Sequence, residues 1–435
     1  MAGLQSALEE RVVEEVRSRR DELVDLVGEL VALDTTARDV DDPPRDEERL
    51  QRLLQARLEA IGAETDLWEP EPTVGDRFLP DGLSFRGRPQ LAARLRGHGA
   101  GRSLLLLGHI DAVSAEPVDR WTSDPFKADV HDGKLYGRGA CDMKGGLGAM
   151  LVALETLHRL GVRTDGDLVW CSVTDEESSG AGGVAAVARG VKADGGICAE
   201  PTGFDTWVAC RGSLTPIITI EGRPGHAEMT QPHWREGGAV NAIEKLPLVL
   251  EAIGRLRHEW RSRPDCRHPH LDPGDIVPTV LRAGEWSVTY PSEAVLTCEV
   301  TYLPTQVDAE GTGKQVEREI YQTVTAAAAR DPWLAEHPLR WFWDGDVVPA
   351  EIPAVHPLVG LIARAASDLS REGAVTGFES WHDGATFIRA GTPTVCFGPG
   401  DRGALHRLDE FTPVDDLVDH AAAVALVVMR WCGVA

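Results

Sequence analysis

The sequence lacks the features that define several classes of protein. None of its apolar runs approaches 18 uninterrupted residues, the length that a membrane-spanning helix requires. The first thirty residues form a charged amphipathic pattern from Glu9 to Leu30, with no signal-peptide core. The eight cysteines form no CxxC pair, and several lie in apolar runs, so we expect buried free thiols. We therefore expect a cytoplasmic protein with no membrane partner.

Positive charge is also scarce. The 44 basic residues face 69 acidic ones, which gives a net charge of −25 and argues against a nucleic-acid partner. There is no GxSxG motif, and no cysteine has the sequence context of a catalytic nucleophile, so serine and cysteine hydrolase chemistry is poorly supported. The hydrophobic fraction of 43% is ample for burial, and 435 residues exceed a typical single core, so two domains are expected.

Apolar runs alternate with helical patterns in the first half of the chain. Helical periodicity is found over about 5–33, 47–62, 144–160 and 182–189, and strand patterns over 90–96, 103–108, 167–174 and 195–199. This alternation predicts a layered α/β domain.

The pattern changes near Gly212. Strands with alternating character at 214–221 and 294–302 flank a predicted helix at 239–257 and a Pro-rich loop at 261–275. A helix at 312–330 and a strand near 338–343 complete a small α+β insert. The α/β pattern then resumes with a helix at 355–369, a strand at 394–397 and a last helix from Val414. We predict a catalytic domain built from 1–211 and 348–435, with 212–347 inserted.

Several polar residues follow apolar strand runs and are flanked by glycines. In an open α/β sheet, chemistry is presented at the carboxyl ends of the strands, so these side chains converge if their strands are neighbours. Histidine and carboxylate ligands suit zinc, cobalt or manganese. Taken alone, each residue also has a plain structural explanation, such as a strand-end cap, a turn acid or a solvated charge. The candidates for a two-metal site are His109, Asp142, Glu176, Glu177, Glu200 and His406.

These residues lie in motifs that occur in a characteristic order: GHIDAV, GRGACDMKGG, TDEESSG, AEPTG, GRPGHA and FGPG…LH…DEF. In this respect nearly the whole chain resembles the co-catalytic zinc family that contains acetylornithine deacetylase, succinyl-diaminopimelate desuccinylase, aminoacylase and glutamate carboxypeptidase. The resemblance implies a zinc-peptidase-like catalytic domain, with a mixed sheet between helices, and an inserted α+β lid that also mediates dimerisation.

The resemblance also implies a ligand set for two divalent ions, most simply zinc, with cobalt or manganese as alternatives. Asp142 bridges the two ions. His109 and Glu200 bind one of them, and Glu177 and His406 bind the other.

Further roles follow from the same resemblance. Asp111 accepts a hydrogen bond from the ring of His109, and Glu176 is the general base. His226 of GRPGHA donates to the oxyanion in the active site of a partner subunit, so a homodimer through the insert is expected. The Asp142–Met143 peptide bond is expected to be cis.

The insert departs from the family pattern. Relatives that bind a substrate carboxylate carry an Asn three residues before a proline and an Arg ten residues after it. Counted from Pro291, these positions hold Val288 and Thr301, which offer no bidentate grip on a carboxylate. Arg282 is the nearest basic candidate to compensate.

The segment 379–387 is a candidate specificity loop. Its Asp383 matches an acid that is common in the family. Trp381 and His382 are candidates to pack against or bind a substrate ring, and a structural role for Trp381 is the alternative.

These observations predict a metal-dependent hydrolase that cleaves a linear amide of a small N-acylated amine, using water activated between two metal ions. The alternatives are a dipeptidase or carboxypeptidase-like enzyme and a non-catalytic ligand-binding relative. The missing Asn and Arg argue against enzymes that grip a free carboxylate. The intact Glu176 argues against a pure binder, which has no need of a base.

Overall fold

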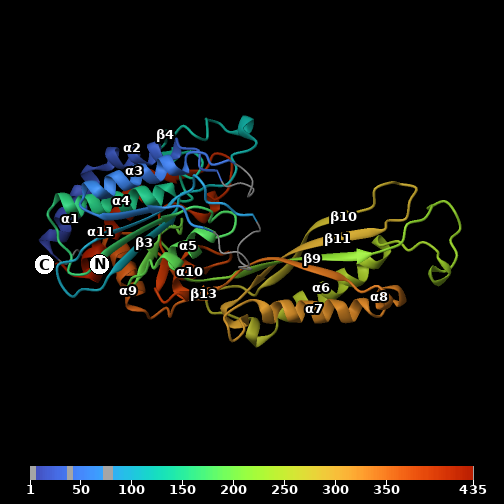
Figure 1. Cartoon of the computed structure of the whole chain (residues 1–435). Coiled ribbons are helices and arrows are strands. Elements are labelled where there is room, and N and C mark those ends of the chain that lie inside the picture. The colour runs from blue at the N-terminus through green and yellow to red at the C-terminus, as the bar shows by residue number, and fades with distance from the viewer. Residues whose placement is uncertain (1–5, 37–42, 72–81, 435) are drawn as a thin grey trace. The chain divides into compact units, whose positions relative to one another are not determined.

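The computed structural model describes residues 6–36, 43–71 and 82–434 (Figure 1). Two compact units are present. The larger unit runs to Ala209 and also takes in Ala350–Gly377 and the chain from His382 onward. The insert comprises Cys210–Pro349 and Phe378–Trp381.

A mixed sheet forms the centre of the larger unit, in the order β1-β2-β6-β3-β7-β15-β8-β13 with β14 beside β8. The four central strands, β6, β3, β7 and β15, are parallel, while β1, β2 and β8 join antiparallel. The predicted α/β class with a mixed sheet is therefore confirmed. The strands are β1 (Glu64–Trp68), β2 (Gln90–Leu95), β3 (Leu104–His109), β6 (Leu168–Val173), β7 (Gly196–Cys198), β8 (Thr206–Cys210), β13 (Ala350–Glu351), β14 (Val375–Phe378) and β15 (Thr394–Cys396).

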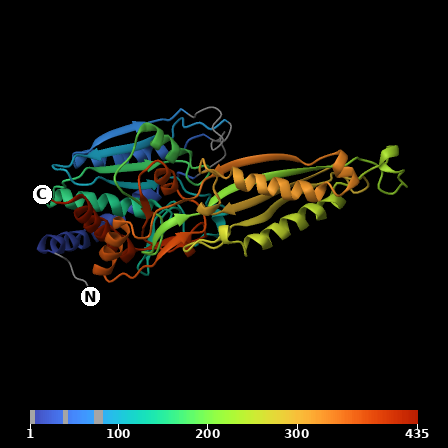
Figure 2. The same cartoon turned by 90° about the horizontal axis from the view of Figure 1, so that it is seen from below.

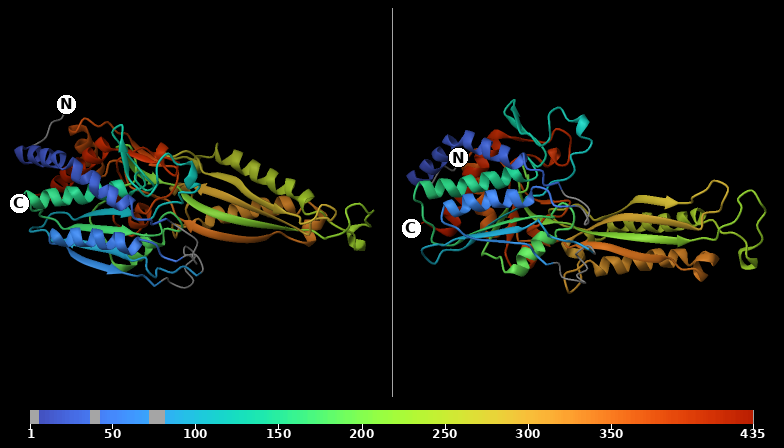
Figure 3. Two further views of the ribbon diagram at one scale, coloured as in Figure 1. Left: turned by 90° about the horizontal axis from the view of Figure 1, so that it is seen from above. Right: turned by 45° about the horizontal axis from the view of Figure 1, so that its top comes forward.

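Helices cover both faces of this sheet. α4 (Lys144–Arg159) connects β3 to β6, and α5 (Ala181–Arg189) connects β6 to β7. The two crossovers run in opposite directions across the sheet, so right-handed connections place α4 and α5 on opposite faces (Figure 1). α11 (Val414–Cys432) packs against α4, α1 (Ala7–Ser18) and α9 (Pro357–Asp368), and α10 (Gly384–Arg389) packs against α5. Figures 2 and 3 show these layers from other sides.

The single helix expected over 5–33 is two helices, α1 and α2 (Arg20–Val31), and residue 5 lies outside the described residues. The break falls at Arg19, whose side chain is only 7% exposed. Its guanidinium donates to the carbonyl of Val152 and to Glu155, both on α4. The chain turns there because α4 holds this arginine. The remaining helix of this unit is α3 (Glu47–Ala60), which lies along β1 and β2.

α4 is buried on almost every side, because it lies between the sheet and the other helices. Its first turn contains Gly145 and Gly146. A Cβ on Gly146 would lie 2.5 Å from the carbonyl oxygen of Ala199, so only glycine allows the helix to approach the end of β7 this closely. The start of α4 is thereby brought next to the carboxyl ends of the parallel strands.

The insert is a four-stranded antiparallel sheet in the order β10-β11-β9-β12, with α6 and α7 on one face (Figure 1). Buried and half-buried residues alternate along β9, as a one-sided sheet requires. Its core is formed by side chains of β9 and β11 that pack against α6 and α7. The elements are β9 (Gly212–Glu221), α6 (Leu246–Trp260), β10 (Asp275–Ala283), β11 (Glu293–Tyr302), α7 (Lys314–Ala328), α8 (Pro332–Glu336) and β12 (Arg340–Val347).

Two expectations for the insert were wrong in detail. The helix predicted over 239–257 begins only at Leu246, since Val240 pairs with Arg223 and a 3-10 turn covers Ile243–Lys245. Strand β10 was not predicted. It is an edge strand with mostly exposed side chains and a bulge after Pro278, so it lacks the alternation that marks a half-buried strand.

A small third sheet orders β16 (Phe411–Pro413), β5 (Lys134–Tyr136) and β4 (Asp129–His131). It ties the segment before the last helix to the segment before Asp142. All eight cysteines are buried and unpaired, as expected. Among the described residues, no helix combines the length and apolarity that a membrane span needs.

Candidate metal centre

The candidate ligands of the larger unit lie at one edge of the central sheet. His109 is the last residue of β3, Glu176 and Glu177 follow β6, and Glu200 follows β7. Asp142 lies just before α4. Because β3, β6, β7 and β15 are parallel, the segments after their last residues meet at the same edge.

Asp142 lies between the two candidate histidines. Its Oδ1 is 3.1 Å from Nε2 of His109, and its Oδ2 is 3.4 Å from Nε2 of His406. The same nitrogen of His406 is 3.1 Å from Oε2 of Glu177. His109, Asp142 and Glu177 each offer a ligand atom, and these atoms lie within 4.8 Å of one another. A carboxylate whose two oxygens face different histidines is arranged as a bridge between two cations.

The tautomer of His109 supports a cation at this position. Its Nδ1 lies 2.9 Å from the backbone oxygen of Asp111, so a neutral ring that donates there would turn its Nε2 lone pair toward Asp142. A lone pair and a carboxylate oxygen 3.1 Å apart repel each other unless a proton or a metal ion lies between them. The donor set therefore fits a divalent cation.

Asp111 accepts hydrogen bonds through both its backbone oxygen and its side-chain carboxylate. Its backbone oxygen, rather than its carboxylate, accepts from the ring of His109, since the nearest carboxylate oxygen is 3.6 Å from Nδ1. The carboxylate instead accepts from the backbone N–H groups of Glu176 and Glu177, at 3.3 and 3.1 Å. One residue thus orients both the histidine at the end of β3 and the acidic loop after β6.

Negative charge accumulates at this edge, and among the described residues no lysine or arginine side chain forms an ion pair with Asp142, Glu176, Glu177 or Glu200. Burial, together with the charge of Asp142, raises the pKa of Glu177 to about 7 and that of Glu200 to about 8. Burial also raises the pKa of Glu176 well above its usual range. Oε1 of Glu177 is buried and has no hydrogen-bond partner among the described residues. Two divalent cations would supply the positive charge that these carboxylates lack.

The neighbouring carboxylates raise the pKa values of both histidines. Hydrogen bonds with Asp142 and Glu177 raise the pKa of His406 to about 10. Burial opposes ionisation of Asp142, yet the hydrogen bonds from His109 and His406 outweigh it and lower the pKa of this carboxyl. Asp142 is therefore the most strongly ionised carboxylate of the cluster, as a bridging ligand must be.

A second pair, Glu410 and Arg138, holds the backbone of Asp142 and was not among the predicted site residues. Oε1 of Glu410 accepts from the backbone N–H groups of Cys141 and Asp142, at 2.8 and 3.1 Å. Its Oε2 accepts from Arg138 at 2.5 Å, and both side chains are buried. The signal was present in the sequence, because Glu410 belongs to the DEF motif shortly after His406. The Asp142–Met143 bond is cis, as expected.

The segment predicted as a specificity loop is largely internal. His382 is 2% exposed and Asp383 is fully buried, so neither offers a surface to a substrate ring, and the expectation for His382 was wrong. Burial raises the pKa of Asp383 to about 8. Trp381 is half-buried, and its indole N–H donates to the carbonyl of Val348. This contact is the structural role that was the alternative for Trp381.

His226 lies in the insert, where it is exposed and pairs with Thr289 in an isolated bridge. The next residue, Ala227, donates its N–H to the carbonyl of Val288 at 2.8 Å. Val288 therefore lies beside the backbone of His226. Thr301 is in β11, where its hydroxyl accepts from the N–H of Asp275.

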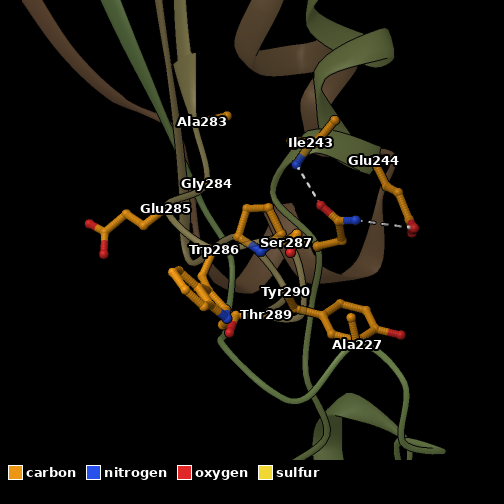
Figure 4. Close-up of a pocket in the computed structure, with 12 residues that line it drawn as sticks. Ala227, Ile243, Glu244, Ala283, Gly284, Glu285, Trp286, Ser287, Thr289 and Tyr290 are labelled. Carbon is orange, nitrogen blue, oxygen red and sulfur yellow. Dashed lines mark hydrogen bonds between the residues drawn. The ribbon is translucent and has the colours of Figure 1, made fainter.

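A cavity of about 570 Å³ adjoins this segment, and we call it the Trp286 pocket (Figure 4). Trp286, with 71% of its surface exposed, and Tyr290 provide aromatic faces. Polar groups come from Asn241, Glu244 and Glu285, and none of the described residues that line the pocket is basic. Arg282 lines an adjoining cavity that also includes Trp286. The pocket thus offers flat apolar surfaces beside hydrogen-bond acceptors.

Comparison with known proteins decides the family. Residues 105–430 match the model described as peptidase family M20/M25/M40. The chain belongs to this family. It is therefore a hydrolase that acts on carbon–nitrogen bonds, in agreement with the resemblance read from the motifs.

Three individual proteins show how similar the chain is to known relatives. The chain is 28% identical to N-formyl-4-amino-5-aminomethyl-2-methylpyrimidine deformylase of Halalkalibacterium halodurans, over 97% of each chain. It is 31% identical to succinyl-diaminopimelate desuccinylase of Methylorubrum populi, over 76% of this chain and 83% of that protein. A dinuclear metal-binding peptidase of the M20 family from Bacillus subtilis superposes with a TM-score of 0.64 at 14% identity, covering 95% of this chain and 99% of that one.

The contacts of Glu410 lead to a prediction. Glu410→Gln keeps the shape of the side chain but removes the charge that pairs with Arg138, so the backbone of Asp142 is held less firmly. We expect metal affinity to fall about 10- to 100-fold, measured by competition with a chelator. Glu48→Gln, at an exposed ion pair on α3, is the matched control and should leave affinity unchanged. Equal affinities for both variants would show that Glu410 has no role in the metal centre.

Proposed function

We propose that this chain is a deacylase that hydrolyses the amide bond of a small N-acylated amine with the help of two divalent metal ions. The observation that carries the proposal is Asp142, whose two carboxylate oxygens face His109 and His406 while Glu177 faces the same His406. Asp142 would bridge the ions, His109 and Glu200 would hold one, and Glu177 and His406 the other. Mixed histidine and carboxylate ligands favour zinc and also suit cobalt or manganese.

When bound, such a metal pair activates a water molecule and polarises the scissile carbonyl. Glu176 would take the proton from the attacking water and deliver it to the leaving amine nitrogen. Its backbone N–H donates to the carboxylate of Asp111, so the residue that orients His109 also positions the base. A non-catalytic binder would have no use for this arrangement.

We also propose that His226 completes the active site of a second subunit. An exposed histidine on the insert is placed to donate to the oxyanion that forms when water attacks the carbonyl. The enzyme would then be a homodimer, with the insert as lid and interface. Eight buried unpaired thiols support a reducing compartment, and we place the enzyme in the cytoplasm.

For the amine, we propose a flat heteroaromatic ring that carries amino groups, and for the acyl group a formyl. Val288 and Thr301 offer no guanidinium for a substrate carboxylate, which argues against carboxypeptidase-like cleavage. Trp286 and Tyr290 offer faces on which a ring stacks, and Glu244 and Glu285 accept from its amino groups. Two residues of the Trp286 pocket, Ala227 and Thr289, adjoin His226, so a role of His226 in the reaction would make this pocket a candidate binding site for the amine. The relationship to the aminopyrimidine deformylase supports the same substrate class.

The role of Glu176 is tested by Glu176→Gln. We expect kcat on N-formyl-4-amino-5-aminomethyl-2-methylpyrimidine to fall about 10²- to 10⁴-fold, because the amide cannot accept the proton of the water. Metal content, measured by elemental analysis, should stay at the wild-type level. Glu59→Gln, on the exposed face of α3, is the control. Full activity in Glu176→Gln would exclude Glu176 as the base.

The role of His226 in trans is tested by mixing two inactive variants, Glu176→Gln and His226→Ala. A mixed dimer has one site with both an intact Glu176 and an intact His226 from the other subunit. Random exchange of subunits should therefore restore about a quarter of the wild-type rate. No recovery, with subunit exchange verified by native mass spectrometry, would contradict the role in trans.

The proposed substrate class is tested by Trp286→Ala. Losing the indole face should raise KM for the formylated aminopyrimidine about tenfold, since aromatic stacking contributes roughly 1 kcal/mol beyond buried area. Phe342→Ala removes another exposed aromatic side chain of the insert and is the matched control. N-succinyl-diaminopimelate and dipeptides are assayed in parallel. Preference of the wild type for either of these over the formylated pyrimidine would overturn the proposed substrate.

A further inference from the structure

A second cavity, of about 430 Å³, lies in the larger unit, and none of the described residues that line it is acidic. Three of the residues that line this cavity are arginines, and residues of the first turn of α9 also line it. In a chain with a net charge of −25, three guanidinium groups around one cavity without a lining carboxylate are unusual. The arginines are Arg102, Arg364 and Arg430.

This cavity lies at the opposite edge of the sheet from the candidate metal ligands. Arg102 comes two residues before β3, whereas His109 ends that strand. The indole N–H of Trp431 donates to the carbonyl of Ser103, which fixes the end of α11 at the same edge. A six-residue strand spans about 20 Å. A ligand in this cavity therefore does not touch the reacting atoms.

Two of the arginines are free to bind a ligand. The guanidinium of Arg102 lies over the ring of Trp431, 3.6 Å from its centroid, so its face is covered while its N–H edge remains available. Neither Arg102 nor Arg364 makes a hydrogen bond or ion pair with the described residues. A Cβ on Gly360 would lie 3.5 Å from Nη1 of Arg364, so Arg364 folds back over a glycine toward the first turn of α9.

Arg430 provides a buried donor that lacks an acceptor. Its side chain is 5% exposed, and its Nε and Nη2 bind Glu9 and Asp368. Neither acid lines the cavity, although Arg430 does. Its Nη1 is buried and has no hydrogen-bond partner among the described residues. Buried donors are nearly always satisfied, so this nitrogen points to an acceptor that a ligand supplies.

The start of α9 adds to the positive potential. The helix has 12 residues, and its first residues, Pro357 and Gly360, lie in the cavity wall. His356 caps it, since its Nδ1 accepts from the N–H of Leu358. Helix N-termini attract anions because their N–H groups point outward and the helix dipole is positive there.

We propose that this cavity, the Arg364 pocket, binds the phosphoryl group of a small phosphorylated metabolite. A planar carboxylate is matched by one guanidinium fork, whereas a tetrahedral dianion accepts from donors that come from several directions. Arg102, Arg364 and Arg430 come from three separate segments and offer such directions. Since the pocket is remote from the metal centre, this ligand is an effector and not the substrate.

The proposal is tested by calorimetric titration of the metal-loaded enzyme at constant ionic strength. The probes are glycerol 3-phosphate, inorganic phosphate and citrate. We expect the two phosphates to bind one per subunit and more tightly than citrate. Arg364→Gln should weaken phosphate binding at least about tenfold, as expected for losing a charge-assisted pair. Arg159→Gln, an exposed arginine of the same unit, is the matched control.

Comparing the affinities of glycerol 3-phosphate and inorganic phosphate shows which parts of the pocket contact the ligand. An ester that binds more tightly than inorganic phosphate shows that the remaining volume is used, and equal affinity shows that the phosphoryl group alone is recognised. Phosphate binding that survives Arg364→Gln would place it at the metal centre and overturn the proposal. Absence of phosphate binding to a correctly folded wild type, or tighter binding of citrate, would overturn it as well.

Discussion

Repulsion among buried carboxylates is the constraint around which the larger unit is built. Asp142, Glu176, Glu177 and Glu200 lie at one edge of the sheet, and burial alone would keep most of them protonated. The fold holds them there with backbone and arginine contacts: Asp111 holds the loop after β6, and Glu410 with Arg138 holds the turn before α4. Cations bound at this edge would offset the charge of these carboxylates. This is the physical reason to regard the cluster as a metal centre.

The two units have different architectures, and each architecture suits a different role. A parallel sheet gathers side chains from distant parts of the sequence at one edge, which suits a fixed reaction centre. In the antiparallel insert, Trp286 lies in the turn between β10 and β11 and His226 in the segment between β9 and α6, and both residues are exposed. Turns accept substitutions that a buried centre does not. Relatives can therefore share the reaction and differ in the amine they accept.

Much of this arrangement could be predicted from the sequence, because its signals are local. The α/β class and the polar residues at the ends of the central strands follow from apolar runs that end in glycine and acid. The convergence of the candidate ligands was expected on condition that these strands are neighbours. The contacts that depend on distant partners could not be predicted. The side chain of Glu410 binds the backbone of Asp142, and the strand that follows Glu410 has only three residues, too few to show periodicity. The buried state of His382 and the start of α6 at Leu246 likewise depend on tertiary packing.

The position of Glu410 late in the sequence has a consequence for assembly of the cluster during synthesis. The candidate ligands begin at His109 and end at His406, and the clamp on Asp142 comes from a residue four positions later still. A nascent chain emerging from the ribosome carries the acidic loop and Asp142 long before it carries His406 or Glu410. The cluster can therefore assemble only after His406 has been made, so a chain that stops before this residue lacks one of the candidate ligands.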